Sequence, residues 1–326
     1  MKRNCVNCLI VGGGKMGLLH GALVNRVSGL RVSGIVDPSF QSRSVAKGIG
    51  ISVPIFSSVG SAIKKLDAGI AIICTPPKSH FSLTKKFMEN GWGVFVEKPL
   101  TMDSNLSQEL VDFAIKHDLY NQVGFQLRFN PAVRFLYDYM NEKDSDILRR
   151  VDSIEIEILS PQFSKITDQN MGLARGGVEW DLLPHVVDLA FYLMNVKRDG
   201  ILSISKTRKD SWKSISTEIG LKEANIKLKA DWANNSVRKV ETRGELVLIG
   251  GSRIYFDMDK VCLNEEVLFH RRAQENPFFE IADQEYSFQI GHLSDNVSDS
   301  PRGPAAGFES GLLVDWAIGE MRDVES

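Results

Sequence analysis

The chain has 326 residues, enough for about two domains, and its 43% hydrophobic and 25% charged residues are typical of a soluble globular protein. Its 39 basic and 41 acidic residues leave a formal net charge of -2, which argues against nucleic acid or an anionic membrane as the main partner. No apolar run approaches the roughly 18 residues that a membrane span needs.

The cysteines predict a reducing compartment. Cys5, Cys8, Cys74 and Cys262 are too few and too scattered for a disulfide framework. Cys5 and Cys8 form a C-x-x-C pair, but it runs into a strand pattern and no second pair completes a zinc site, so we expect no metal. The apolar run after the basic first residues is too short for a signal peptide. We therefore expect a cytoplasmic protein without a targeting segment.

The first part of the chain, up to residue 123, alternates short apolar runs with amphipathic segments. This alternation predicts a parallel sheet with helices on its faces. The runs mostly contain apolar and β-branched residues, as strands buried on both faces do, and lie at Cys8–Val11, Val32–Val36, Ile70–Cys74 and Val94–Val96. Helices are expected at 79–90, before Gly91 as a C-cap residue, and at 104–117, with Ser104 as the N-cap.

A different pattern follows after Asn130-Pro131 and one further helix. Apolar and charged residues alternate at 153–158, 226–230, 245–249 and 253–256, which predicts an open, mostly antiparallel sheet with one wet face. Helical periodicity appears at 178–194 and 308–321. We expect two domains, residues 1–123 and 124–326, the second being an α+β domain.

A glycine motif follows the first predicted strand. Gly12, Gly14 and Gly17 fit G-x-G-x-x-G, the loop also contains Lys15 and Met16, and Asp37 lies twenty residues past Gly17 at the end of the second strand. Such a loop lets a pyrophosphate approach the backbone at a helix N-terminus, which predicts a doubly wound Rossmann sheet that binds a dinucleotide. Asp37 would hold the ribose hydroxyls and repel a 2'-phosphate, which favours NAD over NADP, although Arg43 and Lys47 could soften this preference.

Two further places carry residues suited to chemistry. Lys98 follows the strand at 94–96, at the carboxyl edge of the sheet, where such folds bind ligands; a surface lysine before a turn is the alternative. Asp181 and His185 are spaced i, i+4 on the helix predicted at 178–194, with Asp188 three residues further on. The carboxylate can orient the imidazole, although a histidine among apolar neighbours can also be a core residue.

Together these motifs resemble the Gfo/Idh/MocA family, named for glucose-fructose oxidoreductase and inositol dehydrogenase, whose members are NAD(P)-dependent dehydrogenases. The resemblance spans essentially the whole chain. It rests on Gly12–Gly17 with His20, Asp37, Thr75-Pro76-Pro77 with His80, Glu97-Lys98-Pro99, Gly124–Pro131, and Gly176-Gly177 followed by Asp181, His185 and Asp188. Arg175 stands where the family often has a glycine.

The resemblance implies roles for these residues. Lys98, Asp181 and His185 would be catalytic, and Thr75, Pro76, His80 and Glu97 would line the cofactor site. Glu97 has a second interpretation, as a partner that tunes Lys98. The resemblance also implies a homodimer or homotetramer formed through the second domain's sheet. Trp180 and Trp232 could stack on a sugar, but tryptophans beside apolar runs favour the core.

The implied activity is hydride transfer between the nicotinamide and a secondary hydroxyl or keto group of a sugar, cyclic polyol or nucleotide sugar. His185 would be the general base and Lys98 would stabilise charge on the oxygen, while Asp181 orients His185 or bonds the substrate. The alternatives are a dinucleotide-binding sensor or corepressor without turnover, and a reductase of an imine, dihydrodiol or biliverdin.

Overall fold

The computed structural model describes residues 5–39, 52–142, 146–162, 176–206, 208–211, 213–271, 284–296 and 305–322. The chain divides into two units. Unit 1 comprises residues 1–125 and 281–312, and unit 2 comprises residues 126–280 and 313–326. The sequence predicted one boundary after residue 123 and did not predict that a late segment returns to unit 1.

Unit 1 is built on a six-stranded parallel sheet in the order β3-β2-β1-β4-β5-β6. Its strands are β1 (Val6–Val11), β2 (Leu30–Val36), β3 (Ile55–Phe56), β4 (Ile70–Ile73), β5 (Gly93–Val96) and β6 (Asn121–Val123). Its helices are α1 (Lys15–Val24), α3 (Val59–Ile63), α4 (His80–Met88), α5 (Ser104–His117) and α10 (Gln284–Asn296), with the 3-10 helix η1 (Pro77–Ser79).

The strands of unit 1 form as the sequence predicts because their residues are apolar on both faces. Ile70–Ile73 are all buried, and so are the last four residues of β1. The connections between parallel strands are right-handed, so helices that follow strands on the two sides of β1 lie on opposite faces of such a sheet. The helix α5 begins one position differently from the expectation: Asp103, not Ser104, is its N-cap, and its side chain accepts the N–H of Asn105 at 2.8 Å.

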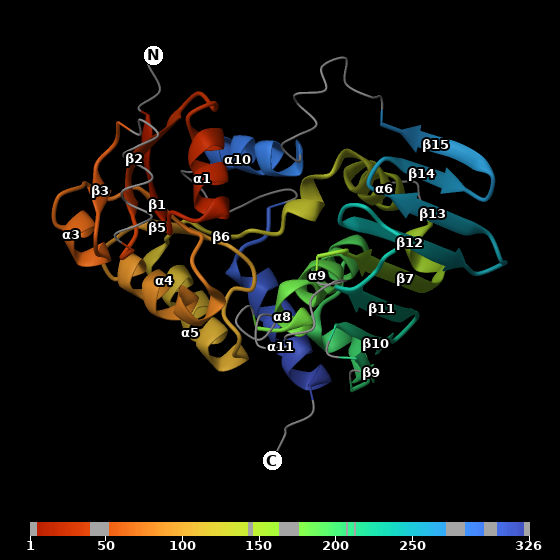
Figure 1. Cartoon of the computed structure of the whole chain (residues 1–326). Coiled ribbons are helices and arrows are strands. Elements are labelled where there is room, and N and C mark those ends of the chain that lie inside the picture. Colours follow the sequence, from red (N-terminus) through yellow and green to blue (C-terminus); the bar gives the residue numbers. More distant parts are fainter. Residues whose placement is uncertain are drawn as a thin grey trace. The chain divides into compact units, whose positions relative to one another are not determined.

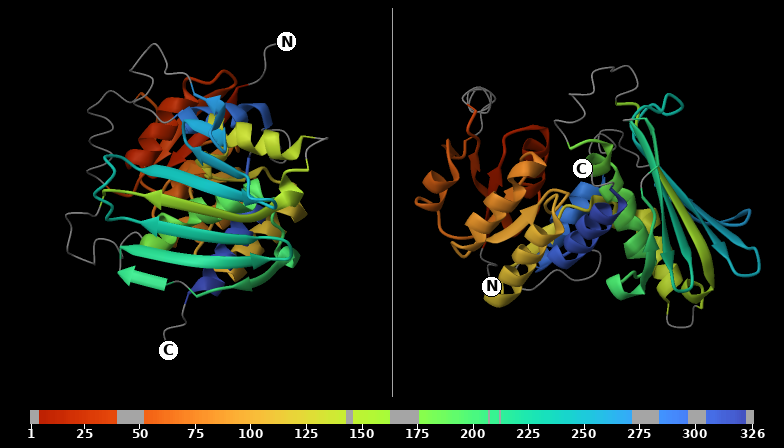
Figure 2. Two further views of the ribbon diagram at one scale, coloured as in Figure 1. Left: turned by 90° about the vertical axis from the view of Figure 1, so that its right-hand side faces the viewer. Right: turned by 90° about the horizontal axis from the view of Figure 1, so that it is seen from below.

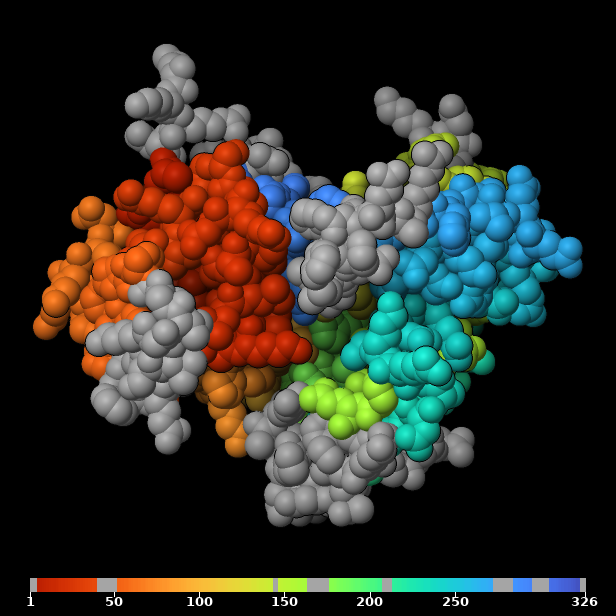
Figure 3. Space-filling view, turned by 45° about the horizontal axis from the view of Figure 1, so that its top comes forward, coloured from red at the N-terminus to blue at the C-terminus, as the bar shows by residue number. Residues whose placement is uncertain are grey.

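The late segment completes the core of unit 1. Helix α10 lies against α1 (Figures 1 and 3). Its Ile290 and Leu293 are fully buried in the cluster that contains Ile10 of β1 and Leu23 of α1. The chain then reaches β6, where Val123 donates its N–H to the carbonyl of Ala306 at 2.8 Å.

Unit 2 is built on a nine-stranded sheet in the order β15-β14-β13-β12-β7-β11-β10-β8, with β9 also paired to β10 (Figure 2). All neighbours are antiparallel except β7 and β11. The strands are β7 (Val151–Leu159), β8 (Ile201–Ile204), β9 (Arg208–Ser211), β10 (Ser214–Leu221), β11 (Asn225–Asp231), β12 (Glu241–Leu248), β13 (Arg253–Asp257), β14 (Lys260–Leu263) and β15 (Glu266–His270).

Three helices of unit 2 pack on one face of this sheet, α6 (Pro131–Asn141), α8 (Val178–Asp181) and α9 (Leu183–Leu193) (Figure 2). Unit 2 also contains most of α11 (Phe308–Met321) and the 3-10 helices η2 (Gln126–Phe129), η3 (Leu148–Arg150) and η4 (Arg198–Gly200). Alternation decides which strand residues meet the helices: Ile154, Ile156 and Ile158 are buried while Glu155 is exposed. In the described part of the chain, no helix has the length and apolarity to span a membrane.

The helix predicted at 178–194 is two helices. Helix α8 ends at Asp181 and α9 begins at Leu183, with Pro184 in its first turn. A proline has no N–H, so the bond from residue 184 to the carbonyl of residue 180 cannot form. The N–H of His185 instead bonds the carbonyl of Leu182 at 3.1 Å. The continuous-helix prediction was therefore wrong at its most important place, between Asp181 and His185.

Candidate functional site

The cofactor residues predicted in unit 1 all follow parallel strands at one edge of the six-stranded sheet. They are the glycine loop after β1, Asp37 after β2, Thr75 and Pro76 after β4, and Glu97 and Lys98 after β5. The strand β1 has β2 on one side and β4 on the other, so the winding of the sheet reverses beside β1. In open α/β sheets, ligands bind at such a switch point, outside the carboxyl ends of the strands.

The glycine loop is shaped by close backbone contacts. Gly12 has a φ of 101°, and a Cβ there would lie 2.9 Å from the carbonyl oxygen of Cys74. A Cβ on Gly17 would lie 1.8 Å from the carbonyl oxygen of Gly12, so only glycine lets α1 approach the loop this closely. By contrast, a Cβ on Gly14 would meet no atom of the described residues within 4 Å.

The start of α1 is suited to an anion. Gly14 is its N-cap, no described side chain caps the first turn, and no acidic residue lies in that turn. The backbone N–H groups of a helix N-terminus and the helix dipole together attract phosphate. The open space beside Gly14 and this uncapped turn, which contains Lys15 and Met16, fit a pyrophosphate.

Asp37 is held in place by two backbone donors. The N–H of Gly13 and the N–H of Ser39 each donate to one oxygen of its carboxylate, both at 2.7 Å. Hydrogen bonds to a charged acceptor are stronger than neutral ones, so the carboxylate is fixed beside the glycine loop. Arg43 and Lys47, which could soften a preference for NAD, lie outside the described residues.

His80 is buried and joins the loops that follow β4 and β5. Its Nδ1 lies 2.7 Å from the carbonyl oxygen of Pro99, and its Nε2 lies 2.8 Å from that of Thr75. Burial lowers the pKa of His80, and the two carbonyls act in the opposite direction. The Lys98-Pro99 bond is cis. This geometry favours an indirect role for His80, which fixes the loop carrying Lys98, while direct contact with the cofactor stays a prediction.

Glu97 forms a buried pair that the sequence did not predict. Its Oε1 lies 2.6 Å from Nε2 of His20 on α1. The ring of His20 is fully buried and lies edge-on to Phe95 and Tyr286. Tyr286 belongs to α10, so the late segment also encloses this pair. His20 is thus a buried partner of Glu97.

Asp181 and His185, in unit 2, lie on either side of the break between α8 and α9. Oδ2 of Asp181 accepts the indole N–H of Trp232 at 3.1 Å. His185 is 8% exposed and lies in the first turn of α9. Trp180 and Trp232 are 2% and 0% exposed, so both belong to the core, as the sequence favoured. The sequence did not predict that Trp232 also bonds Asp181.

Asp188, one turn beyond His185, is paired with Arg128. Nε of Arg128 donates to both carboxylate oxygens at 3.1 and 2.9 Å, and Nη2 donates to Oδ1 at 2.6 Å. Burial raises the pKa of Asp188, and the charge of Arg128 opposes this rise. The guanidinium also lies 4.9 Å from the centre of the Tyr192 ring. Arg128 lies within the 124–131 motif of the resemblance, which was the only signal for it.

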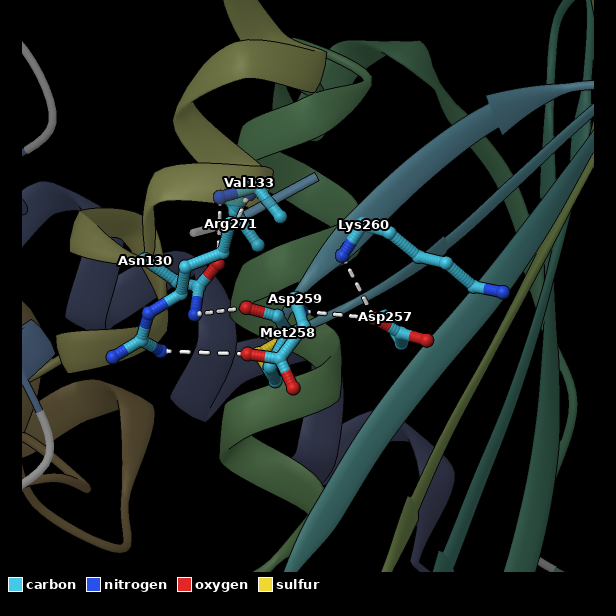
Figure 4. A network of polar contacts seen from close by, with 8 residues as sticks. Asn130, Val133, Asp257, Met258, Asp259, Lys260 and Arg271 are labelled. Carbon is cyan, nitrogen blue, oxygen red and sulfur yellow. Dashed lines mark hydrogen bonds and ion pairs between the residues drawn. The ribbon is translucent and has the colours of Figure 1, made fainter. Parts of the chain in front are cut away.

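The same motif also organises a hairpin of unit 2 (Figure 4). The side-chain oxygen of Asn130 caps α6 by accepting the N–H groups of Ala132 and Val133, at 2.8 and 3.2 Å. Its amide donates to the carbonyl of Met258 in the turn between β13 and β14, at 3.0 Å. Asn130 therefore fastens this hairpin to the start of α6, and the following Pro131 suits the first turn of that helix.

No described group of three or more His, Cys, Asp or Glu side chains is arranged to hold a metal ion. Arg175, which stands where the family often has a glycine, lies outside the described residues.

Comparison with known proteins supports these observations. Residues 6–125 match the Gfo/Idh/MocA family model, described as an oxidoreductase family with an NAD-binding Rossmann fold. The scyllo-inositol 2-dehydrogenase (NAD(+)) of Bacillus subtilis is 30% identical over 203 residues, 59% of this chain and 55% of that protein. The UDP-N-acetylglucosamine 3-dehydrogenase of Acidithiobacillus ferrooxidans is 27% identical over 127 residues, 39% of each. The aligned part thus spans about half or less of these relatives' own length.

A solved structure covers more of the chain. Levoglucosan dehydrogenase, in complex with NADH and levoglucosan, superposes with a TM-score of 0.80 over 99% of this chain and 98% of that one, at 18% identity. At this identity the likeness shows the fold. The predicted fold class, a Rossmann sheet plus a second domain with a mostly antiparallel sheet, is confirmed.

Proposed function

Residues 6–125 belong to the Gfo/Idh/MocA oxidoreductase family, and from this we propose that the chain is an NAD-dependent dehydrogenase. It would transfer a hydride between NAD and a secondary hydroxyl or keto group of a sugar or cyclic polyol. The observation that carries the proposal is the edge of the six-stranded sheet, where the glycine loop, Asp37 and Lys98 follow the carboxyl ends of β1, β2 and β5, around the switch point at β1.

In this proposal, the cofactor is held by residues of unit 1. The pyrophosphate would lie over Gly14 and the uncapped start of α1, and the ribose hydroxyls would bond Asp37. The fixed carboxylate favours NAD over NADP because it repels a 2'-phosphate. Thr75, Pro76 and Glu97 would line the remaining part of the cofactor site.

The catalytic groups would be Lys98, His185 and Asp181. Bound NAD would supply the hydride acceptor for the carbinol carbon of the substrate. His185 removes the hydroxyl proton at one ring nitrogen, and the Lys98 ammonium stabilises the charge that develops on the same oxygen. Asp181 orients His185 or bonds the substrate. In the reducing direction, the same groups return the proton.

The substrate class rests on the relatives. The matched proteins from Bacillus subtilis and Acidithiobacillus ferrooxidans are named for scyllo-inositol and UDP-N-acetylglucosamine, and the superposed structure contains levoglucosan. These molecules share a ring that carries secondary hydroxyl groups. We extend this shared chemistry to the chain as its substrate class.

The proposal includes a cytoplasmic location and self-association into a dimer or tetramer. The location is supported by the described cysteines, all of which are free thiols. Self-association is supported by the open sheet of unit 2, whose described helices α6, α8 and α9 pack on one of its faces.

The test is a turnover assay. Purified protein is incubated with NAD and, separately, with pools of cyclic polyols, free sugars and nucleotide sugars, and NADH formation is followed by absorbance. We expect turnover in one pool. Lys98→Ala and His185→Ala should each lower kcat by about 100-fold or more with little change in NADH binding.

Near-normal turnover in either variant would contradict the assigned roles. Binding of NADH by the wild type without turnover in any pool, in either direction, would favour a dinucleotide-binding sensor instead.

A further inference from the structure

We propose that Trp232 is a positioning residue, whose indole N–H holds the Asp181 carboxylate in its working orientation. This inference rests on the proposed function, because it assigns a partner to one of the proposed catalytic groups. The contact itself is the 3.1 Å hydrogen bond from Nε1 of Trp232 to Oδ2 of Asp181.

The chemistry of the indole gives this bond one direction. An indole has a single N–H donor and no acceptor, and an ionised carboxylate only accepts. Trp232 is fully buried, so water cannot replace the carboxylate as the acceptor of its N–H. A buried donor without an acceptor is costly, and this cost keeps Asp181 at the indole.

The sheet holds Trp232 rigidly. The residue follows directly after β11, which is paired with β7 on one side and β10 on the other. Its own N–H donates to the carbonyl of Lys213 at 2.8 Å, and the preceding Asp231 accepts the N–H of Ser160 at 2.8 Å. The indole is therefore anchored to the middle of a nine-stranded sheet.

Asp181 lies at an interruption between two helices. Asp181 ends α8, a helix of only four residues, and the break before α9 separates it from His185. In a continuous helix, the spacing of four residues would by itself put the two side chains on one face. Leu182, between the two helices, keeps right-handed helical dihedrals with a φ of -99° and a ψ of -40°. The backbone therefore sets only the approximate direction of the Asp181 side chain, and the hydrogen bond to the indole fixes the orientation of its carboxylate.

The first test compares Trp232→Phe with Trp92→Phe. Both replacements remove the indole N–H and part of a buried ring, but Trp92 is 1% exposed in unit 1 and packs on Phe87. We expect Trp232→Phe to lower kcat by about 10- to 100-fold, the usual effect of losing a hydrogen bond to a charged group, while the KM for NAD is unchanged. Trp92→Phe should stay within about twofold of the wild type.

The second test asks whether the effect acts through Asp181. In an Asp181→Ala background, Trp232→Phe should cause no further loss, because the carboxylate that it positions is already absent. Losses that multiply would mean that Trp232 affects turnover by another route, and would overturn the inference.

A third measurement needs no activity. In protein labelled with ¹⁵N-tryptophan, the Trp232 indole signal is identified as the one missing from Trp232→Phe. We expect this signal to move in Asp181→Ala while the Trp92 signal does not. An unmoved Trp232 signal would overturn the inference.

The outcomes separate the two proposals. If Lys98→Ala and His185→Ala are inactive while Trp232→Phe is as active as the wild type, the inference fails and the proposed function stands. If the wild type turns over no polyol or sugar, the proposed function fails, and a moving indole signal still establishes the contact.

Discussion

Breaking the buried pair between Arg128 and Asp188 by removing Arg128 should make the stability of the protein depend more strongly on pH. The two side chains are 9% and 1% exposed, and three N–H···O contacts of 2.6 to 3.1 Å join them. Removing one partner of a buried ion pair leaves the other charge uncompensated, at a cost of about 3 to 5 kcal/mol. The comparison is between Arg128→Met and Asp188→Asn.

Arg128→Met removes the positive charge that opposes the effect of burial on the pKa of Asp188. Burial already raises the pKa of Asp188, so without Arg128 this pKa rises further and the carboxyl takes up a proton in the folded state. When the folded-state pKa of a carboxyl group lies above its unfolded value of about 3.9, the proton that it binds stabilises the folded state. This stabilisation is complete below the unfolded pKa and is lost as pH rises through the folded-state pKa. The loss approaches 1.4 kcal/mol per pH unit, the limit for one proton.

Asp188→Asn has no carboxyl to titrate at this position. It leaves the Arg128 cation in a buried site without its counter-charge. Its loss of about 3 to 5 kcal/mol should therefore be nearly independent of pH.

The assay is urea unfolding followed by circular dichroism at about pH 5 and about pH 8, both above the unfolded pKa of about 3.9, where a raised folded-state pKa makes stability fall as pH rises. Arg128→Met should be destabilised clearly more at the higher pH, and Asp188→Asn equally at both. Equal losses for Arg128→Met at the two pH values, or losses below about 1 kcal/mol, would refute the assignment of this pair as a buried ion pair.

Two further predictions concern the glycine loop and Asp37. Gly17→Ala should shift α1 by about 1 Å or more, since its Cβ would fall 1.8 Å from the Gly12 carbonyl oxygen. Thermal unfolding should then show a lower stability, and NADH fluorescence should show weaker binding of NADH. The matched control is Gly21→Ala on the same helix, whose Cβ would make only an ordinary 3.6 Å contact, and an equal effect of both replacements would contradict this explanation. Asp37→Asn keeps the shape and removes the charge, so the ratio of kcat/KM for NAD to that for NADP should fall at least about 5-fold, the equivalent of about 1 kcal/mol of repulsion; an unchanged ratio would show that the carboxylate does not discriminate.

The sequence predicted the parts of unit 1 that depend on local patterns. Strands buried on both faces are recognisable as apolar runs, and the G-x-G-x-x-G loop with Asp37 has a spacing imposed by the turn itself. These features need no knowledge of distant contacts, and the structure places the loop, Asp37 and Lys98 along one sheet edge.

The partners of the candidate site could not be predicted because they are tertiary contacts. Trp232 lies 51 residues from Asp181, Arg128 lies 60 residues from Asp188, and His20 lies 77 residues from Glu97. No spacing rule connects such pairs. The break before α9, by contrast, had a visible signal in Pro184, whose missing N–H disrupts the helix next to Asp181.

Helix α10 was missed for a related reason. Its sequence, Gln284–Asn296, contains glycine, two serines and several polar residues, and its apolar stripe is short, formed by Tyr286, Ile290 and Leu293. Such a segment has little helical stability of its own and depends on its packing against another element. Here Ile290 and Leu293 enter the core beside α1, a contact that only the fold creates.

The return of this late segment to unit 1 affects how the protein is made. The first 125 residues leave the ribosome before unit 2 exists, but the α10 side of their core stays open until residues 281–312 have been synthesised. During that interval, apolar surface around Ile10 and Leu23 is exposed in the nascent chain, and the ring of His20 lacks Tyr286. Unit 1, although first in the sequence, is thus among the last parts to be finished, and a chain that ends before α10 would leave this apolar surface exposed.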